Sequence, residues 1–176
     1  MKTPETIRTE SLVLRAQTGD AEGFAELVET WQAGLWSFAR VLTGHDESAW
    51  DVTQEVWLAV VRELPQLQDP ARFPAWIFRI ARNKAADLIR RRSRQRAYIQ
   101  DRADADRMEA RNDPIEVRDV LESLPQEEAS LLALHYLQGF GYEELAGILG
   151  IPLGTVKSRL HKARQTFRAR LEQDHE

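Results

Sequence analysis

Cysteine is absent from the chain of 176 residues, and long apolar runs are absent with it. The lack of cysteine excludes disulfide bonds, thiol redox sensing, thiolate nucleophiles and zinc sites with cysteine ligands. The longest uninterrupted apolar run covers residues 56–61, which is too short to span a membrane, and residues 1–10 contain no apolar segment of the signal-peptide type. We therefore expect a cytoplasmic protein without membrane insertion.

Sites of the kinds that usually carry catalysis are also missing from the sequence. It contains no phosphate-binding glycine loop and no nucleophile paired with a base. The four histidines, His45, His135, His161 and His175, are far apart in the sequence and do not have the spacing of metal ligands. We expect no metal, no other cofactor and no enzymatic activity of the chain by itself.

Charge is abundant but unevenly distributed. The net charge is −4, yet residues 76–96 contain eight basic residues and one acid, and residues 152–170 contain six basic residues and no acid. The rest of the chain therefore has a net charge of −17. Two basic strips on an acidic body favour a protein that offers two patches to a polyanion such as DNA. The alternative is two solvated helix faces rich in arginine.

Apolar residues follow helical spacing in nearly every segment. In the first half of the chain, helices are expected over residues 11–18, 20–44, 47–64 and 73–92. Asp20 is expected to be the N-cap of the second of these helices and Gly44 to end it. Residues 64–72 contain two prolines and are predicted to form an ordered loop. After residue 113, helices are expected over residues 115–124, 126–137, 142–149 and 152–171.

Residues 94–113 break this pattern, because charges of both signs alternate there and large apolar residues are sparse. We interpret this segment as a flexible linker. The predicted fold class is therefore all-α, with two small helical domains: residues 1–93, with four helices, and residues 114–176, with a helix-turn-helix.

The helix-turn-helix is predicted over residues 142–161. Ala146, Gly150 and Val156 supply the small residue, the turn residue and the branched apolar residue that close packing of the two helices needs. The second helix can enter a DNA major groove with small, hydroxyl and basic side chains. Its candidate contacts are Gly154, Thr155, Lys157, Ser158, Arg159, His161, Lys162 and Arg164. A helix-turn-helix that only binds proteins is the alternative.

The expected helix from residue 73 has one apolar face and one basic face. The apolar face contains Phe73, Ile77, Ile80, Ala81 and Leu88. The other face contains the candidate DNA contacts Arg79, Arg82, Asn83 and Arg90. Asp87 is interpreted as an internal partner of an arginine.

The expected helix over residues 47–64 combines several acids with more large apolar residues than one packed face can bury. Trp50, Trp57, Leu58 and Val61 are predicted to project away from the stripe that packs inward. An apolar surface with an acidic rim is typical of a protein-binding site. In the alternative, the preceding helices cover this surface on both sides.

Four segments, taken together, resemble the extracytoplasmic-function group of bacterial RNA polymerase sigma factors. They are residues 51–58 (DVTQEVWL), 73–91 (FPAWIFRIARNKAADLIRR), 124–128 (LPQEE) and 150–164 (GIPLGTVKSRLHKAR). The resemblance covers residues 11–171 in order. It implies a promoter-specificity subunit that contains only the second and fourth sigma regions, joined by the linker.

The resemblance also implies roles for individual residues. Those implied to dock on the clamp of the largest polymerase subunit are Asp51, Gln54, Glu55, Trp57 and Leu58. Those implied to read and open the minus-ten element are Gln66, Gln68, Asp69, Arg79, Arg82, Asn83 and Arg90, and one residue of the loop would capture an unstacked base. Residues 152–171 would read the minus-thirty-five element.

The resemblance implies core RNA polymerase, promoter DNA and an anti-sigma factor as partners, with the flap of the second-largest subunit contacted as well as the clamp. We expect the free chain to be a monomer. The competing hypothesis is an autonomous helix-turn-helix regulator, which would need a self-association face. An adaptor that binds only proteins is a third hypothesis, disfavoured by the basic recognition helix.

Overall fold

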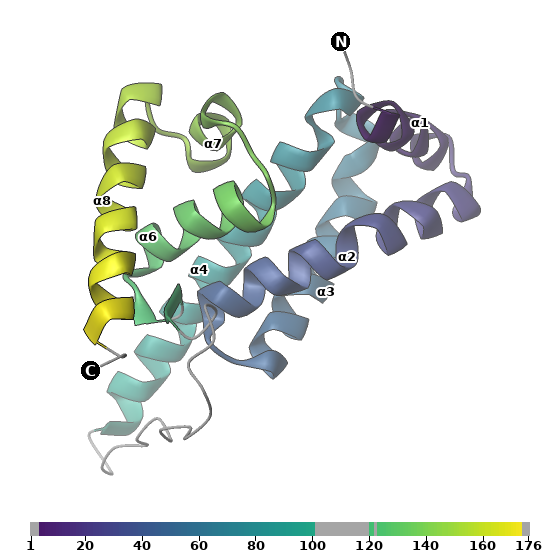
Figure 1. Cartoon of the computed structure of the whole chain (residues 1–176). Helices are drawn as coiled ribbons and strands as arrows, with labels where there is room; N and C mark the ends of the chain where they lie inside the picture. Colours follow the sequence, from purple (N-terminus) through teal and green to yellow (C-terminus); the bar gives the residue numbers. More distant parts are fainter. Residues whose placement is uncertain (1–3, 101–119, 122, 174–176) are drawn as a thin grey trace.

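The computed structural model describes residues 4–100, 120–121 and 123–173, and all regular elements within these ranges are helical (Figure 1). This confirms the predicted all-α class. The elements of the N-terminal half are α1 (Pro4–Gln17), α2 (Ala21–Thr43), α3 (Asp46–Glu63), η1 (Leu64–Gln66), η2 (Pro70–Arg72) and α4 (Phe73–Gln100). Those of the C-terminal half are α6 (Gln126–Leu132), η3 (Ala133–Leu137), α7 (Tyr142–Leu149) and α8 (Leu153–Gln173).

Local signals in the sequence fix several of these boundaries. The Asp20 side chain accepts hydrogen bonds from the backbone N–H groups of Glu22 and Gly23, so it caps α2 as predicted. Gly44 ends α2 with φ 73°, in the left-handed region that glycine adopts without steric cost. Each of the two prolines of the segment 64–72 lies in the first two positions of a short 3-10 turn, and the predicted ordered loop is therefore confirmed.

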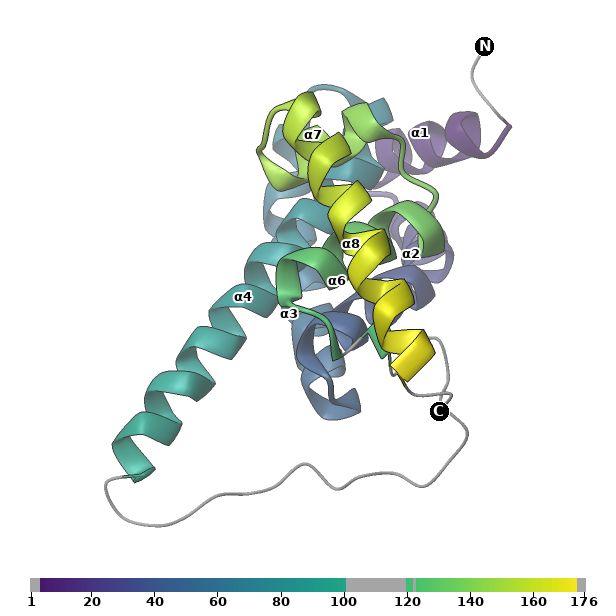
Figure 2. The ribbon, with the colours of Figure 1, turned by 60° about the vertical axis from the view of Figure 1, so that its left-hand side comes forward.

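Two helices are longer than the sequence pattern predicted. α1 begins at Pro4 instead of near residue 11, because Thr9, Leu12 and Val13 form one buried face along it. α4 continues to Gln100, although its apolar stripe ends earlier and the linker was expected from residue 94. Arginine, glutamine and alanine, which are strong helix formers, are frequent in residues 93–100 and favour this continuation. Figure 2 shows this end of α4 extending away from the other helices. The expected linker residues 101–113 lie outside the described ranges.

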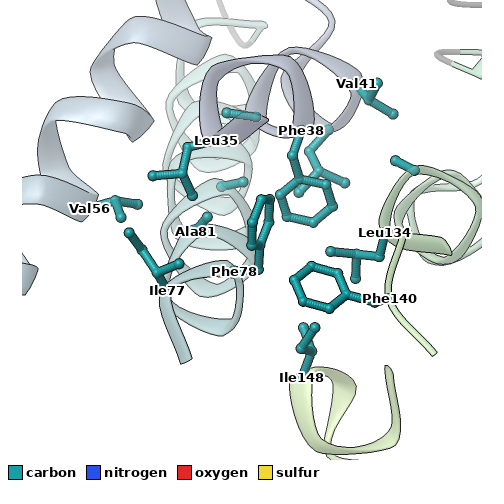
Figure 3. Close-up of a cluster of buried hydrophobic side chains, with 14 of the residues drawn as sticks. Leu35, Phe38, Val41, Val56, Ile77, Phe78, Ala81, Leu134, Phe140 and Ile148 are labelled. Atoms are coloured by element: carbon teal, nitrogen blue, oxygen red, sulfur yellow. The ribbon is translucent and has the colours of Figure 1, made fainter. Parts of the chain in front are cut away.

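The halves share a single hydrophobic core (Figure 3). The Phe78 ring on α4 lies 5.5 Å from the Phe38 ring on α2 and 5.2 Å from the Phe140 ring, which follows η3. The Gln138 side chain donates a hydrogen bond of 3.3 Å to the backbone carbonyl of Gly34 on α2. The C-terminal helices are therefore packed directly on α2 and α4.

Candidate nucleic-acid interface

α7 and α8 form the predicted helix-turn-helix. Gly150 caps α7 with φ 66°, and Val156, Leu160 and Ala163 bury one side of α8 against the preceding helices. The opposite side faces solvent. Exposed there are the predicted contacts Gly154, Lys157, Ser158, Arg159, His161 and Lys162, while Thr155 is half-buried. The structure thus brings most of the predicted contacts together on one open helix face.

Two basic residues of this face contact acids at the start of α6. Arg159 Nη1 lies 2.9 Å from Glu127 Oε2, and Lys162 Nζ lies 3.5 Å from Glu128 Oε1. Arg159, Glu127 and Lys162 are all solvent-exposed, and exposed ion pairs contribute little to stability. Arg159 can therefore exchange the Glu127 carboxylate for a phosphate at small cost, whereas the Glu128 carboxylate that Lys162 contacts is largely buried.

Arg164 differs from the other predicted contacts, because it is held by tyrosines from two preceding elements. Its Nε donates to the Tyr136 hydroxyl at 2.7 Å, and its Nη2 lies 3.4 Å from the Tyr142 hydroxyl. The guanidinium also lies 5.6 Å from the centre of the Tyr136 ring. The hydrogen bonds to Tyr142 and then Tyr136 raise the pKa of Arg164. The two tyrosines were missed by sequence reasoning, since neither lies near Arg164 in the sequence.

The basic face of α4 has the predicted composition. Arg79, Asn83 and Arg90 are exposed, and Arg82 is half-buried. Arg90 Nη2 lies 2.9 Å from Asp87 Oδ1, which confirms the internal pairing predicted for that acid.

An open cavity of about 900 Å³ lies between the loop 64–72, the start of α4 and the start of α7. Gln66, Gln68 and Asp69, the three loop residues singled out from the sequence, all line it. Trp76 and Arg79 contribute from α4. The cavity combines amide, carboxylate, aromatic and cationic groups, which are the groups that hydrogen-bond and stack with an unpaired base.

The loop is held in place by a residue that sequence reasoning missed. Gln17 Nε2, at the end of α1, donates to the backbone carbonyls of Leu64 and Leu67, each at 2.8 Å. Asp69 caps the second turn of the loop by accepting from the backbone N–H of Ala71. The loop is thus built as a fixed wall of the cavity.

The predicted protein-binding surface on α3 is present, with one correction. Trp50, Leu58 and Val61 are exposed, Leu58 at 60%. Trp57, however, does not project into solvent: it is half-buried, and its ring meets the Phe24 ring edge-on at 6.0 Å. α2 therefore covers this side of α3. The alternative interpretation, in which the preceding helices cover the apolar surface, is thus correct for Trp57 but not for the three exposed residues. We therefore define the α3 surface as Trp50, Leu58 and Val61.

The polar candidates beside the α3 surface fall into two groups. Asp51 and Gln54 are exposed. Glu55 forms an ion pair within the chain, since its Oε2 lies 2.8 Å from Lys84 Nζ on α4. The hydrogen bond and charge of Lys84 lower the pKa of Glu55. Glu55 therefore links α3 to the basic helix α4.

In the part of the chain that the structure describes, no group of three or more histidine, cysteine, aspartate or glutamate side chains could hold a metal ion. Among the described helices, none has the length and apolar character needed to cross a membrane.

Comparisons with known proteins match both halves. Residues 27–95 match the family model "Sigma-70 region 2", and residues 115–167 match "Sigma-70, region 4". The chain is 32% identical over 171 residues to the ECF RNA polymerase sigma factor SigC of Mycobacterium tuberculosis, covering 93% of this chain and 91% of SigC. It is 30% identical to the ECF RNA polymerase sigma-E factor of Escherichia coli, covering 93% and 94% of the two chains.

Two further comparisons qualify this similarity. With SigE of Mycolicibacterium smegmatis the identity is 35% over 155 residues, covering 81% of this chain and 59% of SigE. Among solved structures, CnrH in complex with the cytosolic domain of CnrY matches with a TM-score of 0.74 and 27% identity, covering 95% of this chain and 99% of CnrH. The similarity to CnrH therefore includes the arrangement of both halves.

Proposed function

The chain belongs to the ECF RNA polymerase sigma factors, and from this premise we propose how its surfaces direct core RNA polymerase to promoters. The observation that carries the proposal is the presence, in one chain, of region 2 and region 4 with a separate basic surface on each. An autonomous regulator would need one DNA-binding surface and a second copy of itself, so the two unlike surfaces favour the sigma factor. The chain acts through binding energy, as a subunit without catalysis of its own, in the cytoplasm with the polymerase.

α8 is the element that reads the minus-thirty-five sequence. Its exposed start combines small, hydroxyl and basic side chains, which is the composition that contacts base edges and phosphates in the major groove. The contacting residues are Gly154, Thr155, Lys157, Ser158, Arg159, His161 and Lys162. Arg164 orients the helix through Tyr136 and Tyr142 and reaches the DNA only at the margin of the surface.

The cavity and the basic face of α4 act on the minus-ten element. Gln66, Gln68 or Asp69 hydrogen-bonds an unstacked base of the non-template strand, and Trp76 closes the cavity beside it. Arg79, Arg82, Asn83 and Arg90 hold the backbone. Because Gln17 and Asp69 fix the loop beforehand, little conformational entropy is lost when the base enters.

The α3 surface docks on the clamp of the largest polymerase subunit, with Asp51, Gln54, Glu55 and Trp57 beside it. The exposed Trp50, Leu58 and Val61 provide the apolar centre and the acids a polar rim, as in protein interfaces generally. Trp57 supports this surface from beneath, through its contact with Phe24. Residues 1–93 and 114–176 act as the two functional domains, the second of which contacts the flap of the second-largest subunit.

An anti-sigma factor is the other protein partner that we propose. CnrH, whose fold this chain shares over both halves, was solved in complex with the cytosolic domain of CnrY. A protein bound over the α3 surface and α4, or over α8, would block the surfaces assigned to polymerase and DNA. Its release would then allow initiation.

The experiment is transcription by purified core RNA polymerase from the same organism on a library of random promoters, with sequencing of the transcript starts. We expect starts that depend on the chain and share two spaced elements. Lys157→Ala, on the exposed face of α8, should weaken selection of the upstream element only, whereas the control Glu29→Ala, at an exposed position of α2 outside the assigned surfaces, should not. Absence of dependent starts, together with failure to bind core polymerase, would refute the proposal.

A further inference from the structure

Two adjacent acids at the start of α6, Glu127 and Glu128, each pair with a cation of α8. Glu127 Oε2 lies 2.9 Å from Arg159 Nη1, and Glu128 Oε1 lies 3.5 Å from Lys162 Nζ. Both cations belong to the exposed face of α8 that we assign to the minus-thirty-five element. The acids therefore lie at the edge of a DNA-binding surface, where their negative charge alone would repel the phosphate backbone.

The two acids differ in burial. The Glu127 side chain is 68% exposed, whereas that of Glu128 is 13% exposed. The second carboxylate oxygen of Glu128, Oε2, is buried and has no hydrogen-bond partner among the described residues. Both acids lie in the first turn of α6, so the end of the helix favours their charges alike. The difference between them therefore comes from solvation, which Glu127 has kept and Glu128 has largely lost.

This difference decides which cation can leave its partner. When Arg159 turns to a phosphate, water solvates the exposed Glu127 carboxylate, and little free energy is lost. When Lys162 moves away, the Glu128 carboxylate stays buried without its cation, which is strongly unfavourable. The Lys162 side chain is itself 75% exposed, and an ammonium group has three N–H donors. Lys162 can therefore stay with Glu128 and bind a phosphate at the same time.

We propose that Glu128 is a positioning residue for promoter DNA: it holds the Lys162 ammonium in one place, and Lys162 then fixes the phosphate on which α8 is aligned. Contacts with phosphates set the register of a recognition helix, so a cation in a fixed place helps α8 to present its base-reading side chains correctly. Glu127 has the opposite effect, because it competes with DNA for Arg159. This inference rests on the proposed function, since it concerns the surface assigned to the minus-thirty-five element.

Glu127→Gln and Glu128→Gln are a matched pair of variants, because each removes one negative charge at adjacent positions and leaves the size of the side chain unchanged. If the acids only repelled DNA, both variants would bind promoter DNA more tightly. We expect Glu127→Gln to bind more tightly, but Glu128→Gln to bind a promoter with its minus-thirty-five element more weakly. The loss should be about two- to tenfold, which corresponds to the ordering of one long side chain on binding.

The measurement is the equilibrium dissociation constant of the full chain, in complex with core polymerase, for a fluorescent promoter taken from the random library. A second DNA has the same sequence with its upstream element scrambled. Glu128→Gln should weaken binding to the first DNA more than binding to the second.

A chain that carries Lys162→Gln provides the readout that a purely structural role of Glu128 would not change. In this chain Glu128→Gln should cause no further loss of binding, because the side chain that Glu128 positions has been removed. Damage to the fold by Glu128→Gln would instead weaken binding in both backgrounds. Thermal unfolding of each variant, followed by circular dichroism, accompanies the binding measurements.

Either of two results would overturn the positioning role. The first is binding of the intact promoter by Glu128→Gln that is as tight as that of the wild-type chain or tighter, and the second is an equal loss with and without Lys162. If the wild-type chain still prefers the intact promoter to the scrambled one, such a result refutes the positioning role alone. If the wild-type chain binds both DNAs equally, the assignment of α8 to the minus-thirty-five element fails, and the positioning role fails with it.

Discussion

At the scale of single residues, Asp20 gives a prediction about pH. Its Oδ2 accepts from Arg15 Nε at 2.7 Å, and its Oδ1 accepts from the N–H groups of Glu22 and Gly23. The backbone hydrogen bond of Gly23, followed by that of the Arg15 side chain, lowers the pKa of Asp20 below its ordinary 3.8. A depressed folded pKa means that the carboxylate stabilises the fold above the unfolded value and that this contribution disappears as the pH falls through the folded value.

Asp20→Asn keeps an N-capping side chain but removes the charge. We expect it to lower the melting temperature at neutral pH and to approach the wild-type chain as the pH falls below 3.8. Thermal unfolding followed by circular dichroism over this pH range checks it, with Glu29→Gln on the exposed side of the same helix as control. A difference that stays constant down to the most acidic pH would contradict the assigned role of the charge.

The residues that sequence reasoning predicted well are those whose partners are near in the sequence. Asp20 bonds to residues two and three positions later, so its type and place predict the cap. Arg164 and Gln17 could not be interpreted in this way. Their partners lie 28 and 22 positions away for the first and 47 and 50 for the second, and only packing brings them together. Trp57 was misplaced for the same reason, because Phe24 on another helix covers it.

At the scale of elements, the α3 surface gives a prediction that separates docking from stability. Leu58 is 60% exposed on α3, so Leu58→Asp removes no core contact and should change the free energy of unfolding by no more than about 0.5 kcal/mol. A charge at the apolar centre of the docking surface should, however, abolish binding to core polymerase and the dependent transcription.

Leu14→Asp is the matched control for this change. Leu14 is 53% exposed on α1, so it places the same charge on an equally open helix outside the docking surface. Binding of core polymerase by both variants can be compared by surface plasmon resonance, beside their thermal unfolding. Equal loss of binding in both, or wild-type binding by Leu58→Asp, would remove the α3 surface from the polymerase interface.

The elements themselves were predictable, and their ends were predictable only where a cap or proline marks them. The start of α2 at Ala21, after Asp20, and the start of α4 at Phe73, after the proline-containing turn, follow from such signals. Gln100, the end of α4, follows from no such signal. Helix propensity carries α4 past its apolar stripe, and hydrophobic spacing does not predict a helical stretch such as residues 93–95, whose side chains are exposed.

At the scale of the whole molecule, the fold class was predictable but the joining of the halves was not. Phe78 follows Ile77, which the helical wheel assigns to the packed face of α4. Both side chains are buried, so α4 packs on more than one side, whereas the helical spacing of its apolar residues predicts only one packed face. Phe140 lies in a turn without periodicity. The contact between them is therefore a tertiary property that no local pattern encodes.

This shared core leads to the last prediction, which concerns cooperativity. Each half alone is small and would bury only a marginal core, so burial of Phe78 and Phe140 against each other adds to the stability of both. We expect the free wild-type chain to unfold in one calorimetric transition whose van't Hoff and calorimetric enthalpies agree. In Gly34→Gln the new side chain needs the space that Gln138 occupies against α2, since a Cβ atom there would lie 2.7 Å from Gln138 Oε1. This variant should show two transitions, with the C-terminal helices melting first because they have the smaller core of their own. The control Ala33→Gln, at the adjacent exposed position, should keep one. Two transitions in the wild-type chain would mean that the halves are thermodynamically independent and that the contact between Phe78 and Phe140 does not couple them.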